Sequence, residues 1–354
     1  MYQSIMWKYM GEEAILLKQL MEDSEVSEKA SAFQNMQALY IVAHGSSYNA
    51  ANAVAPMLSK LCHVRVYVYT PSNFIHNAHS LNWEDKAHTW VCGISQTGTS
   101  RSVLEAVTRA RNDGFSLLGI TNTVDSPMEQ ISDVCCHLQC GEEDSNAKTK
   151  GYSSTLVLLW KLTLELAKGK NCITEEECAA IKAELIEQIE YLPQLQKQTR
   201  EWCEQHHYGE HMEHLYVIGN GCNFATAMEG MLKLMETMCI PTMFSDIEEF
   251  SHGMHRSVKP ESYVILLHDG LNAELMDKTF AYLNNKGCHT LMLNGADSKG
   301  SKEVIAWNPF PKTSSVLLFT AVIQVISAFV PEARDMDPNR NANDDYTECM
   351  NTRV

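Results

Sequence analysis

The sequence contains one coarse pattern twice: a short apolar strand, then a loop of small residues, then a helix. In the first copy the predicted strand 38–43 leads into Gly45 and a helix over about 48–61. In the second copy the strand 215–218 leads into Gly219 and a helix over about 224–238. Gly219 lies 174 residues after Gly45 (219 minus 45), so each copy has the size of a domain rather than of a solenoid repeat.

Apolar runs alternate with helical patterns inside both copies. Such runs are apolar on both faces, which indicates parallel sheets covered by helices on each side. The sequence therefore predicts an α/β fold with two domains, each a three-layer αβα sandwich. The further strands expected are 64–69, 89–94, 116–120, 134–138, 263–267 and 288–293, with a helix over 273–285.

The chain has 354 residues, which exceeds the length at which a single hydrophobic core usually stops growing. This length agrees with two domains. The stretch 174–202 is dense in Glu and Gln and is expected to be helical, with a break near Pro193. The predicted divisions are an N-terminal helical segment at 1–30, a first domain at 31–170, a helical linker at 171–210, a second domain at 211–333 and a C-terminal tail at 334–354.

Charge and composition exclude several classes of protein. The net charge of -16 argues against a nucleic-acid-binding surface, which needs clustered Lys and Arg. The N-terminus reaches Glu12 and Glu13 without the apolar stretch of a signal peptide or membrane span, so we expect a cytoplasmic protein with no membrane partner. The 12 cysteines are scattered without paired CxxC motifs, as expected of reduced core thiols.

Two clusters have the residue types of a metal site. Cys135, Cys136, His137 and Cys140 lie in a strand-like run, where neighbours point to opposite faces, so we expect that their side chains do not converge. His206, His207, His211 and His214 are irregularly spaced and have no paired cysteines, which favours a solvated polar turn. The sequence thus predicts no metal, and no cofactor is expected.

Two polar loops follow matched strands, at the edge where ligands bind to open parallel sheets. The first contributes Ser46 and Ser47, and the second runs from Ser95 to Ser100. Their hydroxyls, one amide and glycines that allow close backbone approach would form a cradle for a phosphate group. Ordinary helix capping is the plainer explanation for one such loop. Two at matched positions favour phosphate, with the candidate residues Ser46, Ser47, Ser95, Gln96, Thr97 and Ser100.

These loops, together with the segment 148–153, resemble the phosphate-binding segments of sugar isomerase (SIS) domains. The chain is most similar to the isomerase half of glucosamine-6-phosphate synthase and to ketosamine-6-phosphate deglycases, which act on fructosamine, fructoselysine or glucoselysine phosphates. The segment 229–236 resembles the family's EGxLKLxE helix and 249–253 its ExxHG loop. The segment 335–341 resembles its DxDxxRN tail.

The resemblance implies roles for particular residues. Glu236 would be the catalytic carboxylate and His252 the catalytic imidazole, lent by the partner subunit of a homodimer with shared active sites. Lys148, where the synthase has a serine, would be an extra cation for the phosphate or would point to solvent. Supporting roles would fall to Glu229, Lys233, Arg340 and Asn341.

The residues themselves leave two readings of this helix. Glu229, Lys233 and Glu236 recur at helical spacing, which fits an exposed i,i+4 salt bridge. The flanking Met and Leu residues favour a buried helix instead. A buried glutamate suits a base that moves a proton between C1 and C2 of an open-chain sugar phosphate.

Departures from the family pattern narrow the expected activity. Residue 2 is Tyr rather than the glutaminase nucleophile Cys, so glutamine-dependent synthesis is not expected, and Asp344 stands where the synthase has its ring-opening lysine. The leading hypothesis is a ketosamine-6-phosphate deglycase that releases hexose 6-phosphate and an amine. One alternative is an aldose–ketose (amino)sugar-phosphate isomerase, or an enzyme that resembles glucosamine-6-phosphate deaminase or the synthase without its glutaminase domain. Another is a non-catalytic sugar-phosphate-binding regulator, for which a basic helix-turn-helix would be expected.

Overall fold

The computed structural model describes residues 2–294, 304–307 and 313–353. The chain divides into two compact units, each assembled from separate segments. Unit 1 comprises Met1–Ala14, Asp144–Thr149 and Gln188–Ala342, and unit 2 comprises Ile15–Glu143, Lys150–Glu187 and Asn343–Val354. Helices α1 (Met6–Glu22) and α8 (Glu175–Gln205) have residues in both units. Six residues inside the predicted first domain, 144–149, therefore belong to the unit built on the second sheet.

Unit 2 contains a five-stranded, wholly parallel sheet. Its order is β2-β1-β3-β4-β5, which confirms the predicted parallel sheet. The strands coincide with the apolar runs of the sequence because both faces of the sheet are covered. Their bounds are β1 (Ala38–Val42), β2 (Arg65–Tyr69), β3 (Thr89–Ile94), β4 (Ser116–Thr121) and β5 (Val134–His137).

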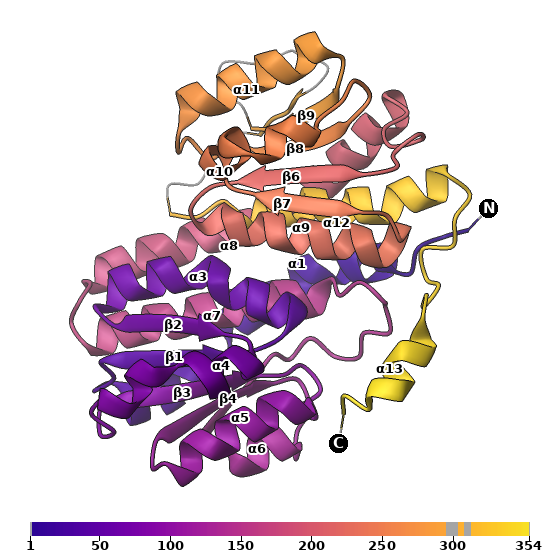
Figure 1. Cartoon of the computed structure of the whole chain (residues 1–354). Coiled ribbons are helices and arrows are strands. Elements are labelled where there is room, and N and C mark those ends of the chain that lie inside the picture. Colours follow the sequence, from indigo (N-terminus) through magenta and orange to yellow (C-terminus); the bar gives the residue numbers. More distant parts are fainter. Residues whose placement is uncertain (1, 295–303, 308–312, 354) are drawn as a thin grey trace. The chain divides into compact units, whose positions relative to one another are not determined.

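Helices lie on both faces of this sheet (Figure 1). On one face α3 (Gly45–Cys62) packs against α7 (Lys150–Gly169). On the other, Tyr40 and Val42 of β1 pack in one buried cluster with Phe74 and Val107. The helices of that face are α4 (Pro71–Asn77), α5 (Arg101–Asn112) and α6 (Pro127–Ile131), and the unit also holds α2 (Glu25–Lys29), η1 (Ala30–Phe33), η2 (His79–Trp83) and α13 (Asp344–Met350).

Unit 1 contains a second parallel sheet, of order β10-β9-β8-β6-β7. Numbered within its own unit, each sheet has the order 2-1-3-4-5, which confirms the internal repeat at the level of topology. The strands are β6 (Leu215–Gly219), β7 (Thr242–Ser245), β8 (Tyr263–Leu267), β9 (His289–Leu293) and β10 (Val304–Ile305). The sequence did not predict β7 and β10, which have four and two residues and so carry little pattern.

The second sheet is also covered on both faces. Helices α9 (Cys222–Met238) and α12 (Val316–Ala333) pack together on one face, and α10 (Ile247–His252) and α11 (Ala273–Lys286) lie on the other, followed by η3 (Met254–Ser257) after α10 (Figure 1). In the part of the chain that is described, α12 is the one helix long and apolar enough to cross a membrane. Because 83% of it is buried inside the structure, it is a core helix of this unit.

The predicted break near Pro193 is wrong, because α8 runs without interruption through that residue. Proline removes one backbone donor from a helix and leaves the carbonyl four residues earlier without its partner. Pro193 itself lies on the exposed side of α8, so its ring does not have to fit into the packed face of the helix. The helix therefore tolerates the proline.

Candidate functional site

The first polar site of unit 2 lies where the connections of the sheet change direction. Strands β1 and β3 are neighbours, but the chain leaves β1 toward β2 on one side and β3 toward β4 on the other. Open α/β sheets bind ligands at such a switch point, outside the carboxyl ends of the two strands. The loop Ser95–Ser100 follows β3, and Ser46 and Ser47 follow β1, so the fold brings the predicted phosphate residues to one edge.

The Ser95–Ser100 loop is held in shape by its own hydrogen bonds. The backbone N–H of Gly98 donates to the carbonyl of Ser95 at 2.9 Å, and the N–H of Ser100 donates to Oγ of Ser95 at 3.4 Å. The hydroxyls of Thr97 and Thr99 lie 2.8 Å apart. Gly98 has φ +69°, and a Cβ there would lie 2.3 Å from Ser126, so only glycine fits this turn. The loop is thus preformed, with Thr97 exposed.

Ser46 and Ser47 lie in the first turn of α3 rather than in a separate loop. The first N–H groups of a helix have no partner within it and form a ready site for an anion. The residue before α3, His44, directs Nε2 to Oγ of Ser102 in α5 at 2.8 Å, which links the two candidate segments. Partial desolvation lowers the pKa of His44, although the residue keeps an exposed surface.

The matching edge of the second sheet has different chemistry. There the side chain of Asn223 donates to Asp269 at 2.9 Å and to Ser315 at 3.0 Å. A carboxylate that follows β8 repels an anion at the position where unit 2 places serine and threonine hydroxyls. Of the two copies, unit 2 is therefore the one whose edge carries hydroxyl side chains rather than a carboxylate.

Unit 1 instead carries a line of buried charged residues along α9. The Nζ of Lys233 lies 2.8 Å from Oε1 of Glu229, with 0% and 1% of the two side chains exposed. Lys233 also donates to the backbone carbonyl of Lys148. These contacts confirm that the helix is buried rather than carrying a surface salt bridge.

Glu236, one turn further along α9, is the most perturbed carboxyl group of the candidate site. Its Oε2 is buried and has no hydrogen-bond partner within the described residues. Burial raises the pKa of Glu236 to about 7, with Glu229 adding to the rise and Lys233 and Lys148 opposing it. A carboxylate with a pKa near neutrality can both accept and return a proton at physiological pH, as a proton-transfer catalyst must.

The short segment 144–149 also contacts α9 beside Glu236, which was not predicted. The side-chain amide of Asn146 donates to the carbonyl of Glu236 at 3.1 Å and to that of Arg340 at 3.5 Å. Lys148 does not simply point to solvent: its Nζ donates to the carbonyl of Ser145 at 3.1 Å, and its charge acts on Glu236. A lone asparagine in a loop carries no pattern by which it could have been found.

The other predicted residues of unit 1 are exposed. His252 ends helix α10 on the surface, and in the described chain it shares no hydrogen bond or ion pair with Glu236. Arg340 and Asn341 are exposed as well, and the backbone carbonyl of Arg340 accepts the hydrogen bond from Asn146. The catalytic pairing of His252 with Glu236 therefore stays a prediction.

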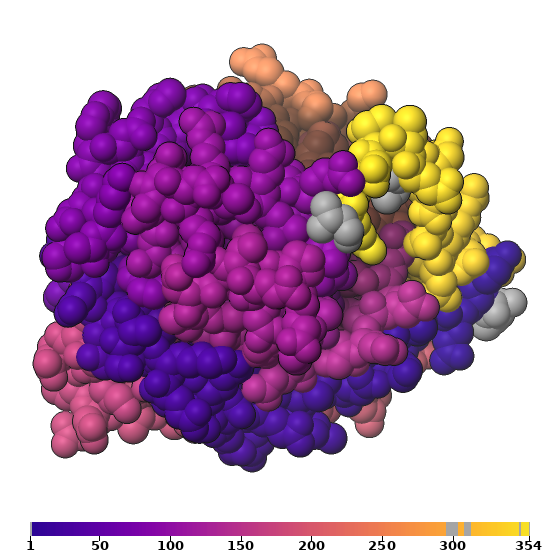
Figure 2. Space-filling model, turned by 90° about the horizontal axis from the view of Figure 1, so that it is seen from below, coloured from indigo at the N-terminus to yellow at the C-terminus, as the bar shows by residue number. Residues whose placement is uncertain are grey.

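The last residues of the chain reach the Ser95–Ser100 loop within unit 2. Ser100 forms an antiparallel bridge with Arg353, and the N–H of Arg101 donates to the carbonyl of Thr352 at 3.1 Å. Figure 2 shows this C-terminal segment, in yellow, on the outside of the molecule. The end of the predicted tail therefore lies against one of the predicted phosphate loops.

We expect the stability of the folded chain to depend on pH through Glu236. Its pKa is higher in the folded state than the ordinary 4.5, so ionisation destabilises the fold increasingly as the pH rises from about 4.5 to about 7. Glu236→Gln cannot ionise, and it should be more stable than the wild type by about 2–3 kcal/mol at pH 8 but nearly equal to it at pH 5. Urea unfolding at both pH values measures this, and an equal difference at both would contradict it.

Comparison with known proteins identifies the family to which this fold belongs. The family model described as the SIS domain matches residues 33–165 and 210–329. Glutamine–fructose-6-phosphate aminotransferase (isomerizing) of Clostridium acetobutylicum is 24% identical over 339 residues, which cover 93% of this chain and 54% of that protein. The chain thus spans about half the length of this relative.

Two solved structures share the fold at lower identity. The C-terminal domain of glucosamine-fructose-6-phosphate aminotransferase from Francisella tularensis aligns with a TM-score of 0.85 and 23% identity, covering 96% of this chain and 99% of that one. Glucosamine-6-phosphate deaminase from Thermotoga maritima aligns with a TM-score of 0.76 and 18% identity, covering 96% and 97%. With both predicted domains matched by the family model and both sheets in one topology, the chain belongs to the SIS domain family.

Proposed function

We propose that this protein is a sugar-phosphate enzyme that cleaves a 6-phosphorylated ketosamine into a hexose 6-phosphate and a free amine. The observation that carries the proposal is Glu236, a largely buried carboxyl group with an unpaired oxygen and a pKa raised to about 7. A protein that only binds sugar phosphates has no use for such a group. Catalytic groups, in contrast, need a pKa near the working pH.

The chemistry follows from the position of the amine on C1 and the carbonyl on C2. Glu236 removes a proton from C1 while the C2 carbonyl oxygen receives a proton, which gives an enaminol. C2 then receives a proton and the nitrogen loses one, so that the C1–N bond becomes an imine and C2 carries a hydroxyl group. Water then adds to C1 and the C–N bond breaks, which releases the amine and leaves the hexose 6-phosphate as an aldehyde. The carboxylate of Glu236 must therefore accept and deliver one proton in each turnover.

His252 is proposed to serve the oxygen or the departing amine, lent by the partner subunit of a homodimer. Its exposure at the end of α10 supports this role, since a side chain given to a second subunit must project from its own. Histidine is suited to it because its ordinary pKa lies near neutral pH.

The phosphate is proposed to bind the cradle of unit 2, which makes phosphorylation the condition for recognition. Replacing Ser95 and Thr97 together by alanine should raise KM at least tenfold with little change in kcat, because a hydrogen bond to a charged group contributes about 1.5–3 kcal/mol and the phosphate is remote from C1. Steady-state kinetics measure this. Thr108→Ala, an exposed threonine of α5, is the control. Equal turnover of phosphorylated and unphosphorylated ketosamine would refute the assignment.

An aldose–ketose isomerase or deaminase uses the same proton transfer on a smaller substrate, and the names of the similar proteins keep this second candidate open. A product screen separates the two. Purified protein is given fructosyl and glucosyl ketosamine 6-phosphates, glucosamine 6-phosphate, and fructose 6-phosphate with glutamine. Equal amounts of hexose 6-phosphate and amine from a ketosamine support the deglycase. Release of ammonia from glucosamine 6-phosphate alone supports the deaminase, and formation of glucosamine 6-phosphate from glutamine would refute both.

A further inference from the structure

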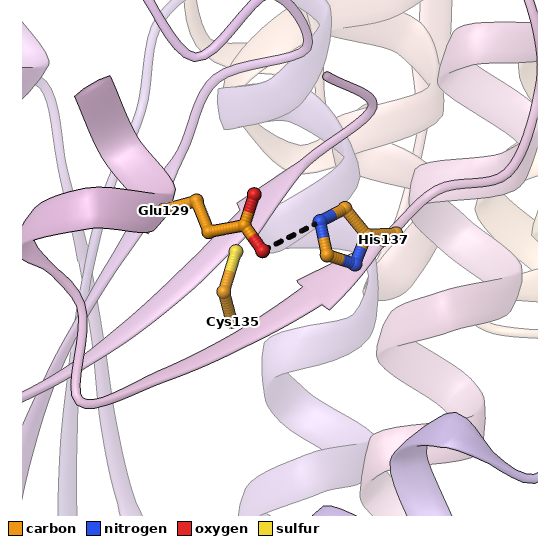
Figure 3. Close-up of side chains that lie close together, drawn as sticks. All are labelled: Glu129, Cys135 and His137. Carbon is orange, nitrogen blue, oxygen red and sulfur yellow. Dashed lines mark ion pairs between the residues drawn. The ribbon is translucent and has the colours of Figure 1, made fainter. Parts of the chain in front are cut away.

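Three potential metal ligands converge at the edge of the unit 2 sheet, away from any residue assigned above. Glu129 comes from α6, and Cys135 and His137 come from β5 (Figure 3). Their ligand atoms all lie within 4.8 Å of one another. The expectation that the cysteine–histidine run does not converge is therefore wrong for one pair. Residues two apart in a strand share a face, so Cys135 and His137 point the same way while Cys136 points the other.

The imidazole of His137 is oriented as a ligand. Its Nε2 is buried and makes no hydrogen bond within the described residues, although it lies 3.3 Å from Oε1 of Glu129. Its Nδ1 lies 2.7 Å from Oε1 of Glu25, and Oε2 of Glu25 accepts the backbone N–H of His137 at 3.0 Å. Histidines that bind metals typically donate their other ring N–H to a carboxylate, which fixes the tautomer and aims the free nitrogen.

From this arrangement we propose that Glu129, Cys135 and His137 bind a divalent transition-metal ion of the zinc class. Thiolate, imidazole and carboxylate are the ligands that zinc uses in proteins. Two ligand atoms about 2.0–2.1 Å from a tetrahedral ion lie about 3.3–3.4 Å from each other, which matches the separation of His137 from Glu129. The sulfur of Cys135 lies within 4.8 Å of both other ligand atoms, and joining them requires it to come to about 3.5–3.6 Å from each.

The charges around the site favour a dication. Glu25 and Glu129 each carry one negative charge, and Cys135 adds a third when it binds as a thiolate. The amine of Lys29, 2.6 Å from Glu25 and hydrogen-bonded to the carbonyl of Cys135, supplies one positive charge. The remaining two negative charges equal the charge of the ion.

The site leaves one coordination position for water. The side chain of Glu129 is 28% exposed, so the cluster is reached from solvent, while Cys135 and His137 are largely buried. The ion would join α6 to β5 and, through Glu25, to α2. None of its ligands is among the residues of the proposed reaction, so the ion is assigned no part in that reaction.

The competing account is a charged imidazolium held between the carboxylates of Glu25 and Glu129, with Cys135 as a packing thiol. That account predicts no metal binding. The metal site and the charged imidazolium agree equally well with every contact described above. The experiment must therefore detect a bound ion.

The experiment uses the full chain, stripped with chelator under reducing conditions and titrated with Co²⁺. We expect one equivalent to bind with the visible bands of tetrahedral cobalt and a near-ultraviolet thiolate-to-cobalt band. Zn²⁺ should displace it and raise the melting temperature. Cys135→Ser should abolish the thiolate band, and Cys136→Ser, the buried neighbour on the other face, should retain it. Glu25→Gln should weaken Zn²⁺ binding about 10–100-fold without changing the stoichiometry.

The chain has 12 cysteines, so the experiment must show that the thiolate bound to the metal is that of Cys135. Failure to bind Co²⁺, or a thiolate band equal in the wild type and Cys135→Ser, would overturn the proposal. If Cys135→Ser does not fold, Glu129→Gln serves instead, since this side chain is partly exposed. It should keep the thiolate band but shift the visible bands and weaken Zn²⁺ at least tenfold, and unchanged visible bands with unchanged affinity would also overturn the proposal.

Discussion

Glu236→Gln should lower kcat on a ketosamine 6-phosphate by about a hundredfold or more while the protein stays folded. Glutamine keeps the size of the side chain but cannot accept a proton from carbon, and general-base catalysis typically contributes 10²–10⁴-fold. KM should change little, because the lost interaction is made in the transition state. Steady-state amine release at pH 7.5 measures both constants.

The matched control is Glu274→Gln, which makes the same chemical change on the exposed face of α11 in the same unit. It should leave kcat unaltered. His252→Ala should cause a loss comparable to that of Glu236→Gln, and the double variant should be little worse, since residues acting as a unit are not additive. Near-normal kcat in a folded Glu236→Gln protein would refute the mechanism and favour a sugar-phosphate-binding protein.

Lys233→Met should destabilise the chain by about 3–5 kcal/mol. The side chains of Lys233 and Glu229 are 0% and 1% exposed, so the substitution removes the positive charge of Lys233 from beside a buried carboxylate. It also removes the donor to the carbonyl of Lys148. Urea or guanidinium unfolding measures the loss, and near-normal stability would show that this pair is hydrated.

α11 provides the control for this experiment. Glu274 and Lys278 form an i,i+4 pair of the same orientation at 2.5 Å, with side chains 83% and 71% exposed. Lys278→Met should cost about 0.5 kcal/mol or less, because exposed pairs of this kind contribute little. The contrast between two pairs of equal spacing isolates the effect of burial.

The fold was largely predictable because its strands are buried on both faces. The apolar runs predicted at 38–43, 89–94, 215–218 and 263–267 correspond to the four strands β1, β3, β6 and β8. The order of the strands was not predicted, because a parallel repeat is compatible with more than one order. The short strands β7 and β10 and the continuity of α8 through Pro193 depend on tertiary packing, which local pattern does not encode.

The candidate site was predictable only where a helix face carries it. The spacing of Glu229, Lys233 and Glu236 indicates one side of α9, and the apolar flanks indicate its burial. Asn146 could not be predicted, because its contact with Glu236 exists only in the folded chain. There the segment 144–149 belongs to the unit that contains residues 188–342. The convergence of Glu129 on Cys135 and His137 likewise depends on how α6 packs beside β5, which the local sequence does not encode.

The role of Glu236 as the base that removes a proton from C1 is tested most directly by following the hydrogen on that carbon. A fructosyl ketosamine 6-phosphate carrying two deuterium atoms on C1 is incubated with the wild type, Glu236→Gln and Glu274→Gln, and the loss of C1 deuterium is read by nuclear magnetic resonance. The account predicts that wild type and Glu274→Gln remove one deuterium as amine appears, and that Glu236→Gln does so at least a hundredfold more slowly. Loss of C1 deuterium at the wild-type rate in Glu236→Gln, or none in the wild type, would contradict it.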